Sequence, residues 1–184
     1  TLSCTPYDRG IETPEGIGSW AESNAVCFSN SYTSLITNRE SGLSALATAL
    51  TGWAPDWGLH LEGNRLPNLL VDVEVDLSDS TDWSVLGDWI GAQRGPHWRM
   101  PFGPMPVIRT QNKDPTFEMR KALTAAAANH GCPMLWLNDD DADVSNIQDT
   151  LVFTSEHLDT SYAKLAPKGE VDLVVIGCPQ ASIG

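Results

Sequence analysis

The sequence is poor in positive charge. Lysine and arginine number 11 against 24 aspartates and glutamates, which gives a formal net charge of −13. Nucleic acid and anionic membranes would repel such a surface, so we expect neither as a partner. No apolar run approaches the ~20 residues that cross a bilayer. The first residues, Thr1 to Cys4, also lack the basic and apolar regions of a secretory signal. We therefore expect a cytoplasmic protein.

Common nucleotide-binding and hydrolase motifs are missing as well. The chain contains no GxGxxG, Walker A or GxSxG pattern and no visible internal repeat. Its 184 residues are 41% hydrophobic, which is enough for a folded domain with a sizeable core. One compositionally biased stretch, from Trp83 to Pro106, is rich in glycine, proline and tryptophan. We expect that stretch to form a loop or lid.

Cysteine is scarce, and its spacing indicates no local zinc site. The four cysteines include no CxxC pair and are Cys4, Cys27, Cys132 and Cys178. Cys4 and Cys178 each lie in a proline-containing loop. A thiolate held on rigid backbone suits an iron–sulfur ligand, but cysteine is also a common core residue, so both interpretations stay open. We expect Cys27 and Cys132 to be buried and unpaired.

Apolar residues alternate between helical and strand spacing. The pattern predicts helices over 41–50, from Asp114 as cap to 131, and over 156–165. It predicts strands over 69–77, 106–110, 133–137 and 171–176, the last as a fully buried strand. Strands separated by such helices predict an α/β fold with a mostly parallel sheet and flanking helices. Functional side chains in such folds gather at the carboxyl ends of strands, which places Cys178 and Gln180 in a candidate site.

Polar residues cluster among apolar neighbours near the start of the chain. They form the segments Glu22-Ser23-Asn24 and Thr37-Asn38-Arg39-Glu40. One interpretation is structural, with Asn38 as a helix cap and Arg39 paired with Glu22 or Glu40. The other is a small-anion site, in which these groups converge at the start of the helix over 41–50, whose dipole favours a carboxylate or phosphate.

The remaining candidates are isolated. His60 is the most interesting of the four histidines, whereas His130 is expected to be a charge at the C-terminus of a helix. The acidic run Asp139 to Asp143 lacks the spacing of an EF-hand, which favours a solvated loop over a Ca²⁺ or Mg²⁺ site.

Together these motifs resemble the large-subunit portion of the aconitase X family. The resemblance rests on CTPY at 4–7, ESNAV at 22–26, TNRE at 37–40, ALTG at 49–52, GLH at 58–60 and GCP at 177–179, in the family's order. Members of the family have a longer large portion, joined to or associated with a small swivelling domain or subunit. We therefore expect residues 1–184 to be an incomplete, aconitase-like catalytic region of a longer chain, in agreement with the missing initial Met.

The resemblance implies an iron–sulfur hydro-lyase, which removes water from a small hydroxy acid. Family members dehydrate cis-3-hydroxy-L-proline or mevalonate 5-phosphate, and we expect the hydroxyproline, since a carboxylate suits Asn38-Arg39 without further basic residues. Carried over by motif, Cys4 and Cys178 match cluster ligands, with a third ligand outside this chain. The residues assigned to substrate binding are Ser23, Asn24, Asn38, Arg39, His60 and Gln180. No general base is assigned in this chain, and the fragment alone is expected to be inactive.

Three departures from the family pattern keep a second class of function open. The family has histidine where this chain has Gln180, and Gly-Ala-Arg where it has Ser34-Leu35-Ile36. It also has a histidine-containing loop where this chain carries the run Asp139 to Asp143. Because glutamine cannot titrate, no proton transfer is expected at position 180. The two cysteines favour a working dehydratase, whereas Ile36 and Gln180 favour a non-catalytic homologue with a structural or regulatory role.

Overall fold

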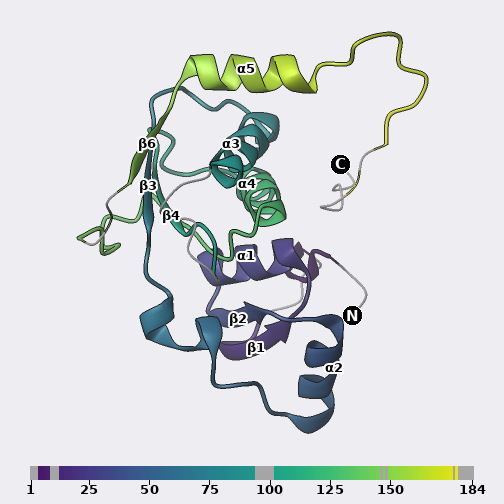
Figure 1. Cartoon of the computed structure of the whole chain (residues 1–184), viewed down its shortest axis with the longest axis vertical. Helices are drawn as coiled ribbons and strands as arrows, with labels where there is room; N and C mark the ends of the chain where they lie inside the picture. Colours follow the sequence, from purple (N-terminus) through teal and green to yellow (C-terminus); the bar gives the residue numbers. More distant parts are fainter. Residues whose placement is uncertain are drawn as a thin grey trace.

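In the described part of the chain, the fold consists of two parallel β-sheets with flanking helices (Figure 1). The computed structural model describes residues 4–8, 13–93, 102–145, 147, 149–175 and 177. The helices are α1 (Ser23–Tyr32), α2 (Gly42–Thr51), α3 (Ser80–Ala92), α4 (Phe117–Asn129) and α5 (Ser155–Leu165), with short 3₁₀ turns η1 (Pro6–Asp8), η2 (Gly58–His60) and η3 (Glu62–Asn64). The strands are β1 (Gly16–Trp20), β2 (Leu35–Arg39), β3 (Leu69–Val73), β4 (Pro106–Arg109), β5 (Trp136–Leu137) and β6 (Thr150–Phe153). This arrangement confirms the predicted α/β class.

The smaller sheet pairs β1 with β2 in parallel. Gly16 lies opposite Leu35, and Trp20 lies opposite Arg39. Parallel neighbours need a crossover connection, which α1 provides here. Gly18 in β1 leaves room for the side chain of Leu35, since a Cβ at this glycine would lie 2.8 Å from the Leu35 Cδ1 atom. The parallel register places the carboxyl ends of both strands at one edge of the sheet.

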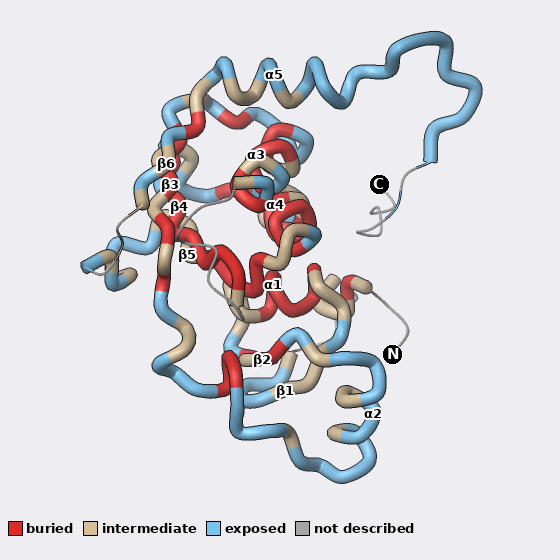
Figure 2. The backbone as a smooth tube through the Cα atoms, viewed as in Figure 1, coloured by how far each residue is buried: buried red, intermediate tan, exposed pale blue. Residues whose placement is uncertain are grey.

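The larger sheet has the order β5-β4-β3-β6 in the described part of the chain, with every neighbouring pair parallel. Figure 1 shows α3 and α4 side by side on one face of this sheet, with α1 between α4 and the smaller sheet. The core lies between the larger sheet and these helices (Figure 2). Its side chains come from strands and helices alike and include Leu69, Val71, Ile108, Trp83, Leu86, Ile90, Leu123, Ala127 and Phe153.

Several predicted elements are confirmed at their expected places. Helix α2 begins after Ser41, whose hydroxyl accepts a 3.0 Å hydrogen bond from the Ser44 amide, and ends at Gly52 with φ +74°. Strand β3 shows the predicted alternation of buried and partly exposed residues, but it ends at Val73 and not at 77 as predicted. Helix α4 starts later than predicted, because Thr116 and not Asp114 caps it, with its hydroxyl accepting from the Met119 amide. Strand β5 is confined to two residues, although the preceding Met134 and Leu135 are buried as expected.

The predicted loop from Trp83 to Pro106 is wrong over its first part, because residues up to Ala92 belong to α3. Asp79 caps this helix through hydrogen bonds from the amides of Thr81 and Asp82, and Trp83 is fully buried. Its glycines serve helix packing: a Cβ at Gly87 would collide with the carbonyl oxygen of Leu123 in α4. Composition suggested a loop because close helix contact and turns both select glycine.

The predicted buried strand over 171–176 is also wrong for its described residues. Residues 171–175 are in no strand, and Leu173, Val174 and Val175 are 78%, 72% and 84% exposed. Figure 1 shows the segment after α5 leading away from both sheets. A strand needs a neighbour for its backbone hydrogen bonds, and apolar β-branched residues alone do not supply one.

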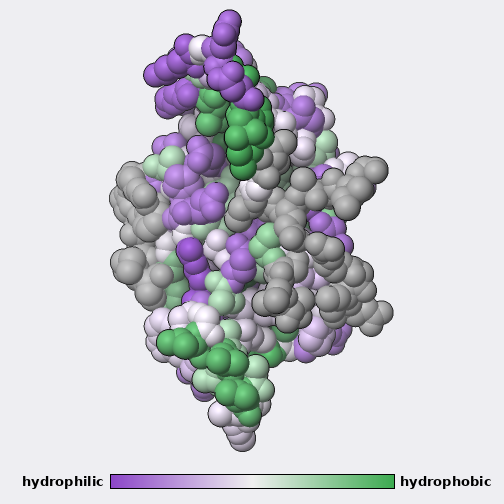
Figure 3. Space-filling model, turned by 90° about the vertical axis from the view of Figure 1, so that its right-hand side faces the viewer, coloured by the Kyte–Doolittle hydropathy of each residue, from purple (hydrophilic) through white to green (hydrophobic). Residues whose placement is uncertain are grey.

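Apolar side chains also gather on the surface of α2. Leu43, Leu46 and Leu50, which the sequence places on one helical face, are 81%, 55% and 79% exposed, and Trp53 after the helix is 81% exposed. Figure 3 shows this apolar patch at the end of the molecule that α2 forms. An apolar face at helical spacing is typical of a helix that packs against a core, but these side chains stay exposed in the described structure. In the described part of the chain, no helix is long and apolar enough to cross a membrane.

Candidate functional site

The carboxyl edge of the smaller sheet brings the predicted polar segments together. Ser23 and Asn24 open α1 just after β1, while Asn38 and Arg39 close β2. Because Trp20 pairs with Arg39, the two segments leave the sheet side by side. Parallel α/β units place binding groups at this edge. The predicted residues are therefore neighbours through topology, although they are 14 positions apart in sequence at their closest (24 and 38).

Arg39 is exposed and available to a ligand. Within the described residues its guanidinium makes no hydrogen bond or ion pair. The carboxylates suggested as its structural partners are engaged elsewhere: Glu22 accepts from the Ala25 amide at 2.8 Å, and Glu40 accepts from the Ser44 hydroxyl. The structural interpretation of Arg39, an ion pair with Glu22 or Glu40, thus has no support in the described contacts.

A cavity of about 450 Å³ opens beside Arg39. Its lining includes one cation, Arg39, and a histidine, His130, together with amide and apolar groups, and consists of Asn38, Arg39, Trp57, Leu59, Phe102, Gly103, Asn129, His130, Gly131 and Pro133. His130 is the C-cap residue of α4, as expected, and its Nε2 lies 2.8 Å from Oδ1 of Asp88. Ser23 and Asn24 are not part of this lining, so one cavity does not unite the predicted binding residues.

Asn38 is occupied by the protein's own backbone. The side chain is only 5% exposed; its Nδ2 donates to the Trp57 carbonyl at 2.9 Å, and its Oδ1 accepts from the Leu59 amide at 2.6 Å. Gly58, with φ +66°, lies so close that any side chain there would strike the Asn38 amide. Asn38 therefore lies in β2 and holds the η2 turn, and it does not cap a helix.

His60 contacts Asn38 and the loop before the same η2 turn. Its Nδ1 is 2.7 Å from the Pro55 carbonyl oxygen and its Nε2 is 3.1 Å from that of Gly18, while the ring is 8% exposed. The backbone N–H of Asn38 also points at Nε2 of His60, and the two nitrogens are 3.4 Å apart. His60 thus joins the loop before η2 to β1, one residue behind the cavity wall at Leu59.

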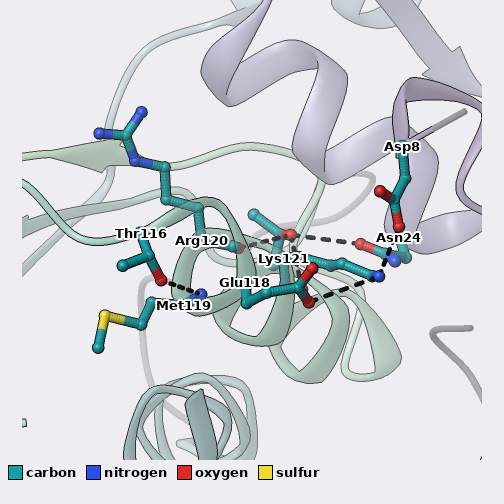
Figure 4. A network of polar contacts seen from close by, with 8 residues as sticks. Asp8, Asn24, Thr116, Glu118, Met119, Arg120 and Lys121 are labelled. Carbon is teal, nitrogen blue, oxygen red and sulfur yellow. Dashed lines mark hydrogen bonds and ion pairs between the residues drawn. The ribbon is translucent and has the colours of Figure 1, made fainter. Parts of the chain in front are cut away.

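Asn24 belongs to a second polar network, drawn in Figure 4. Its Oδ1 accepts from the Thr124 hydroxyl at 3.2 Å, whereas its Nδ2 has no hydrogen-bond partner in the described structure. Beside it, Nζ of Lys121 lies 2.7 Å from Oδ2 of Asp8 and 3.6 Å from Oε2 of Glu118. Lys121 was not singled out from the sequence. The sequence feature that could have identified it is a lysine on the alanine-rich face of a helix, three positions before Thr124.

Tyr7 packs next to Asn24. Its ring stacks on Phe28 of α1, with centroids 3.8 Å apart and planes inclined by 4°. Burial raises the pKa of the Tyr7 hydroxyl. The η1 turn, two residues after Cys4, is thereby fixed against α1.

The predicted metal ligands are only partly described. Cys4 is partly buried, while Cys178 and Gln180 lie outside the described residues, so the proximity of the two cysteines stays a prediction. Among described residues, no three His, Cys, Asp or Glu side chains form a group that could hold a metal ion, the acidic run from Asp139 included. Cys27 and Cys132 are buried and free, as predicted. Burial raises the pKa of the Cys27 thiol, which disfavours the thiolate that metals bind.

A family model and a solved structure that match this chain are both described as aconitase X. Residues 1–63 match a family model described as the aconitase X first domain. A crystal structure of aconitase X from Thermococcus kodakaraensis, in its holo form, superimposes with a TM-score of 0.83 at 31% identity, covering 98% of this chain and 46% of that one. This likeness extends well beyond the part that the family model matches.

Two kinds of curated relative align with the chain. The phosphomevalonate dehydratase large subunit of Thermococcus kodakarensis is 34% identical over 192 residues, which is 100% of this chain and 47% of that protein. The cis-3-hydroxy-L-proline dehydratase of Pseudomonas aeruginosa is 31% identical over 199 residues, covering 99% of this chain and 33% of the relative. The chain spans about half the length of the large subunits that it matches.

Proposed function

Because the chain belongs to the aconitase X family, we propose that it forms part of a hydro-lyase that dehydrates mevalonate 5-phosphate. The observation that carries the choice of substrate is the alignment of the whole chain with large subunits of phosphomevalonate dehydratases, at up to 34% identity. This reverses the order expected from the sequence, which placed cis-3-hydroxy-L-proline first. The large-subunit relatives also support a small subunit or domain as the partner of this chain.

Arg39 is the residue that we assign to the anionic group of the substrate. It is free of protein carboxylates, and it lies just before Ser41 and α2, whose N-terminus favours negative charge. A guanidinium can form two parallel hydrogen bonds with a phosphate or carboxylate. Asn38 supports this role indirectly, because its amide fixes the η2 turn that forms one wall of the adjoining cavity.

The chemistry of dehydration requires that a C–O bond breaks and that a base removes a proton from the neighbouring carbon. We propose that Cys4 and Cys178 help to hold an iron–sulfur cluster, and the placement of Cys4 in a turn packed against α1 fits a ligand. Such a cluster, when bound, supplies an open iron as a Lewis acid for the departing hydroxyl. Ser23, at the first position of α1, would face the substrate from the β1 side of the same edge.

The test uses the complete protein that contains this chain, purified anaerobically with its small partner. We expect it to release dehydrated product from mevalonate 5-phosphate. Arg39→Lys should raise KM for this substrate because an ammonium cannot form the paired hydrogen bonds of a guanidinium. Arg109→Lys is the matched control, since Arg109 is an exposed residue at the end of β4 in the other sheet.

The outcomes separate the candidate functions. Turnover of cis-3-hydroxy-L-proline alone would establish the second candidate, which is favoured by the single cation, Arg39, in the cavity lining. A protein that binds its cluster but turns over neither substrate would establish a non-catalytic homologue. The departure at Ile36, which lies in the middle of β2 opposite Ile17, is the structural argument for that reading.

A further inference from the structure

Lys121 is a buried cation that none of the motifs explains. It is 2% exposed and is the one lysine or arginine among the buried residues of the described structure. Its helix, α4, is otherwise lined on this face by alanines and packs against α1 and α3. Burying an ammonium group is costly unless it is paired, so a lysine at this position requires carboxylate partners.

The principal partner comes from the first turn of the chain. Nζ of Lys121 donates to Oδ2 of Asp8 at 2.7 Å, across 113 positions of sequence, and a second carboxylate, Glu118, lies at 3.6 Å. Asp8 ends the η1 turn, and its amide donates back to the Thr5 carbonyl at 3.0 Å. Thr5, which is 1% exposed, directly follows Cys4. The ion pair, drawn in Figure 4, therefore acts on the short turn over residues 5–8 that directly follows this cysteine, the Cys4 turn.

The difference in burial shows which partner is fixed. Lys121 lies in a helix that belongs to the core, whereas the side chains of Asp8 and Glu118 are 25% and 49% exposed. Without the ammonium group, two carboxylates would share one site and repel each other. The η1 turn lies at the surface, so it would move in preference to α4.

We propose that Lys121 is a positioning residue, whose ion pair with Asp8 holds the Cys4 turn against α1 and α4. The inference rests on the proposed function only for the meaning of Cys4 as a cluster ligand. The positioning itself is a property of the apoprotein and can be measured without a metal. The stack of Tyr7 on Phe28 also orients this turn, through contacts with α1.

The test measures how fast iodoacetamide alkylates each cysteine of the apoprotein, by peptide mapping of the whole chain. We expect Lys121→Met and Asp8→Asn each to speed alkylation of Cys4 roughly tenfold, because the turn then opens more often. The double variant should not alkylate faster than Lys121→Met, since both substitutions break the same Lys121–Asp8 ion pair. Lys121→Arg should restore slow alkylation. Lys113→Met is the matched control, because Lys113 is exposed and unpaired in the described structure, and it should change nothing.

Buried Cys27 serves as an internal standard, because a general loss of stability would expose it together with Cys4. Selective acceleration at Cys4 supports positioning. Equal acceleration at both cysteines, or no change at Cys4 in folded Asp8→Asn protein, would overturn it. If Lys121→Met does not fold, Asp8→Asn is the deciding variant. The Asp8 side chain is partly exposed, so its replacement disturbs the core less. A complete protein without a cluster would refute the proposed function and leave this measurement untouched.

Discussion

The hydroxyl of Tyr162 donates a 2.7 Å hydrogen bond to Oδ1 of Asp82, which lies 80 positions earlier. It joins α5 to the first turn of α3, where Oδ2 of the same carboxylate accepts from the amide and the hydroxyl of Ser78, each at 2.8 Å. Burial raises the pKa of Asp82, but the hydrogen bonds from Tyr162 and Ser78 together outweigh it and hold the pKa below its usual range. The raised pKa of Tyr162, about 12, has the same bond to Asp82 as its first cause.

Tyr162→Phe should lower the free energy of unfolding by about 1 kcal/mol at pH 7, because Asp82 loses a donor. The folded-state pKa of Asp82 is depressed, so its stabilisation is present above about pH 4 and is lost as the pH falls through the lower folded value. As the pH falls below about 4, the Tyr162→Phe variant should lose less stability than the wild-type protein does. The raised pKa of Tyr162 stabilises the native state below about pH 10, and that stabilisation is lost toward pH 12.

Urea denaturation at several pH values measures both effects. The Asp82→Asn variant provides the comparison, because it removes the carboxylate and leaves Tyr162 in place. Parallel stability curves for the wild-type and Tyr162→Phe proteins across the whole pH range would contradict the link between this bond and the titration.

Gly87→Ala should destabilise the protein by about 1–3 kcal/mol through overpacking. A Cβ at this position would collide with the Leu123 carbonyl and would lie 3.0 Å from the Cβ of Ala126. Alanine normally favours a helix over glycine by about 1 kcal/mol, so a loss of stability would show that helix packing outweighs propensity. Gly63→Ala is the control, since no atom lies within 4 Å of a Cβ built there. Thermal unfolding of the two variants is the measurement, and equal melting temperatures would contradict the prediction.

Asn38→Ala should lower the free energy of unfolding by about 1–3 kcal/mol, because the Trp57 carbonyl and the Leu59 amide lose their partner. Arg39→Ala should change stability by less than about 0.5 kcal/mol, since Arg39 is exposed. Chemical denaturation of both variants separates a residue that supports the fold, Asn38, from the adjacent residue that we propose to bind the substrate. A large loss of stability in Arg39→Ala would mean that Arg39 supports the fold.

Residues 1–184 alone should remain colourless after anaerobic treatment with iron and sulfide, and should turn over neither proposed substrate. Only Cys4 and Cys178 are assigned as ligands, and Cys27 and Cys132 are buried in the core. An incomplete ligand set does not retain a metal centre of this kind. Visible absorption and a product assay provide the measurement. A stable brown fragment would show that the chain contains a complete ligand set.

Local patterns in the sequence were sufficient for elements whose signals are local. Ser41 and Gly52 delimit α2 because capping and the left-handed conformation depend on neighbouring residues only. The alternation over 69–77 identified β3, although the strand ends at Val73, because one face of the strand is more buried than the other. The arrangement of strands and helices indicated the α/β class, and the ESNAV and TNRE motifs indicated the family.

Long-range packing decided the features that the sequence could not. The glycines of α3 resemble loop glycines until Leu123 of α4 is placed against Gly87. Residues 171–175 have the composition of a strand, but no strand pairs with them in the described structure. Lys121 and Asp8 meet across 113 positions, and Asn38 is occupied by η2, because the energy of these contacts depends on groups that only the fold brings together. The sequence alone therefore determined the family and the local elements, whereas the tertiary structure decided which polar residues support the fold and which, like Arg39, remain free to bind.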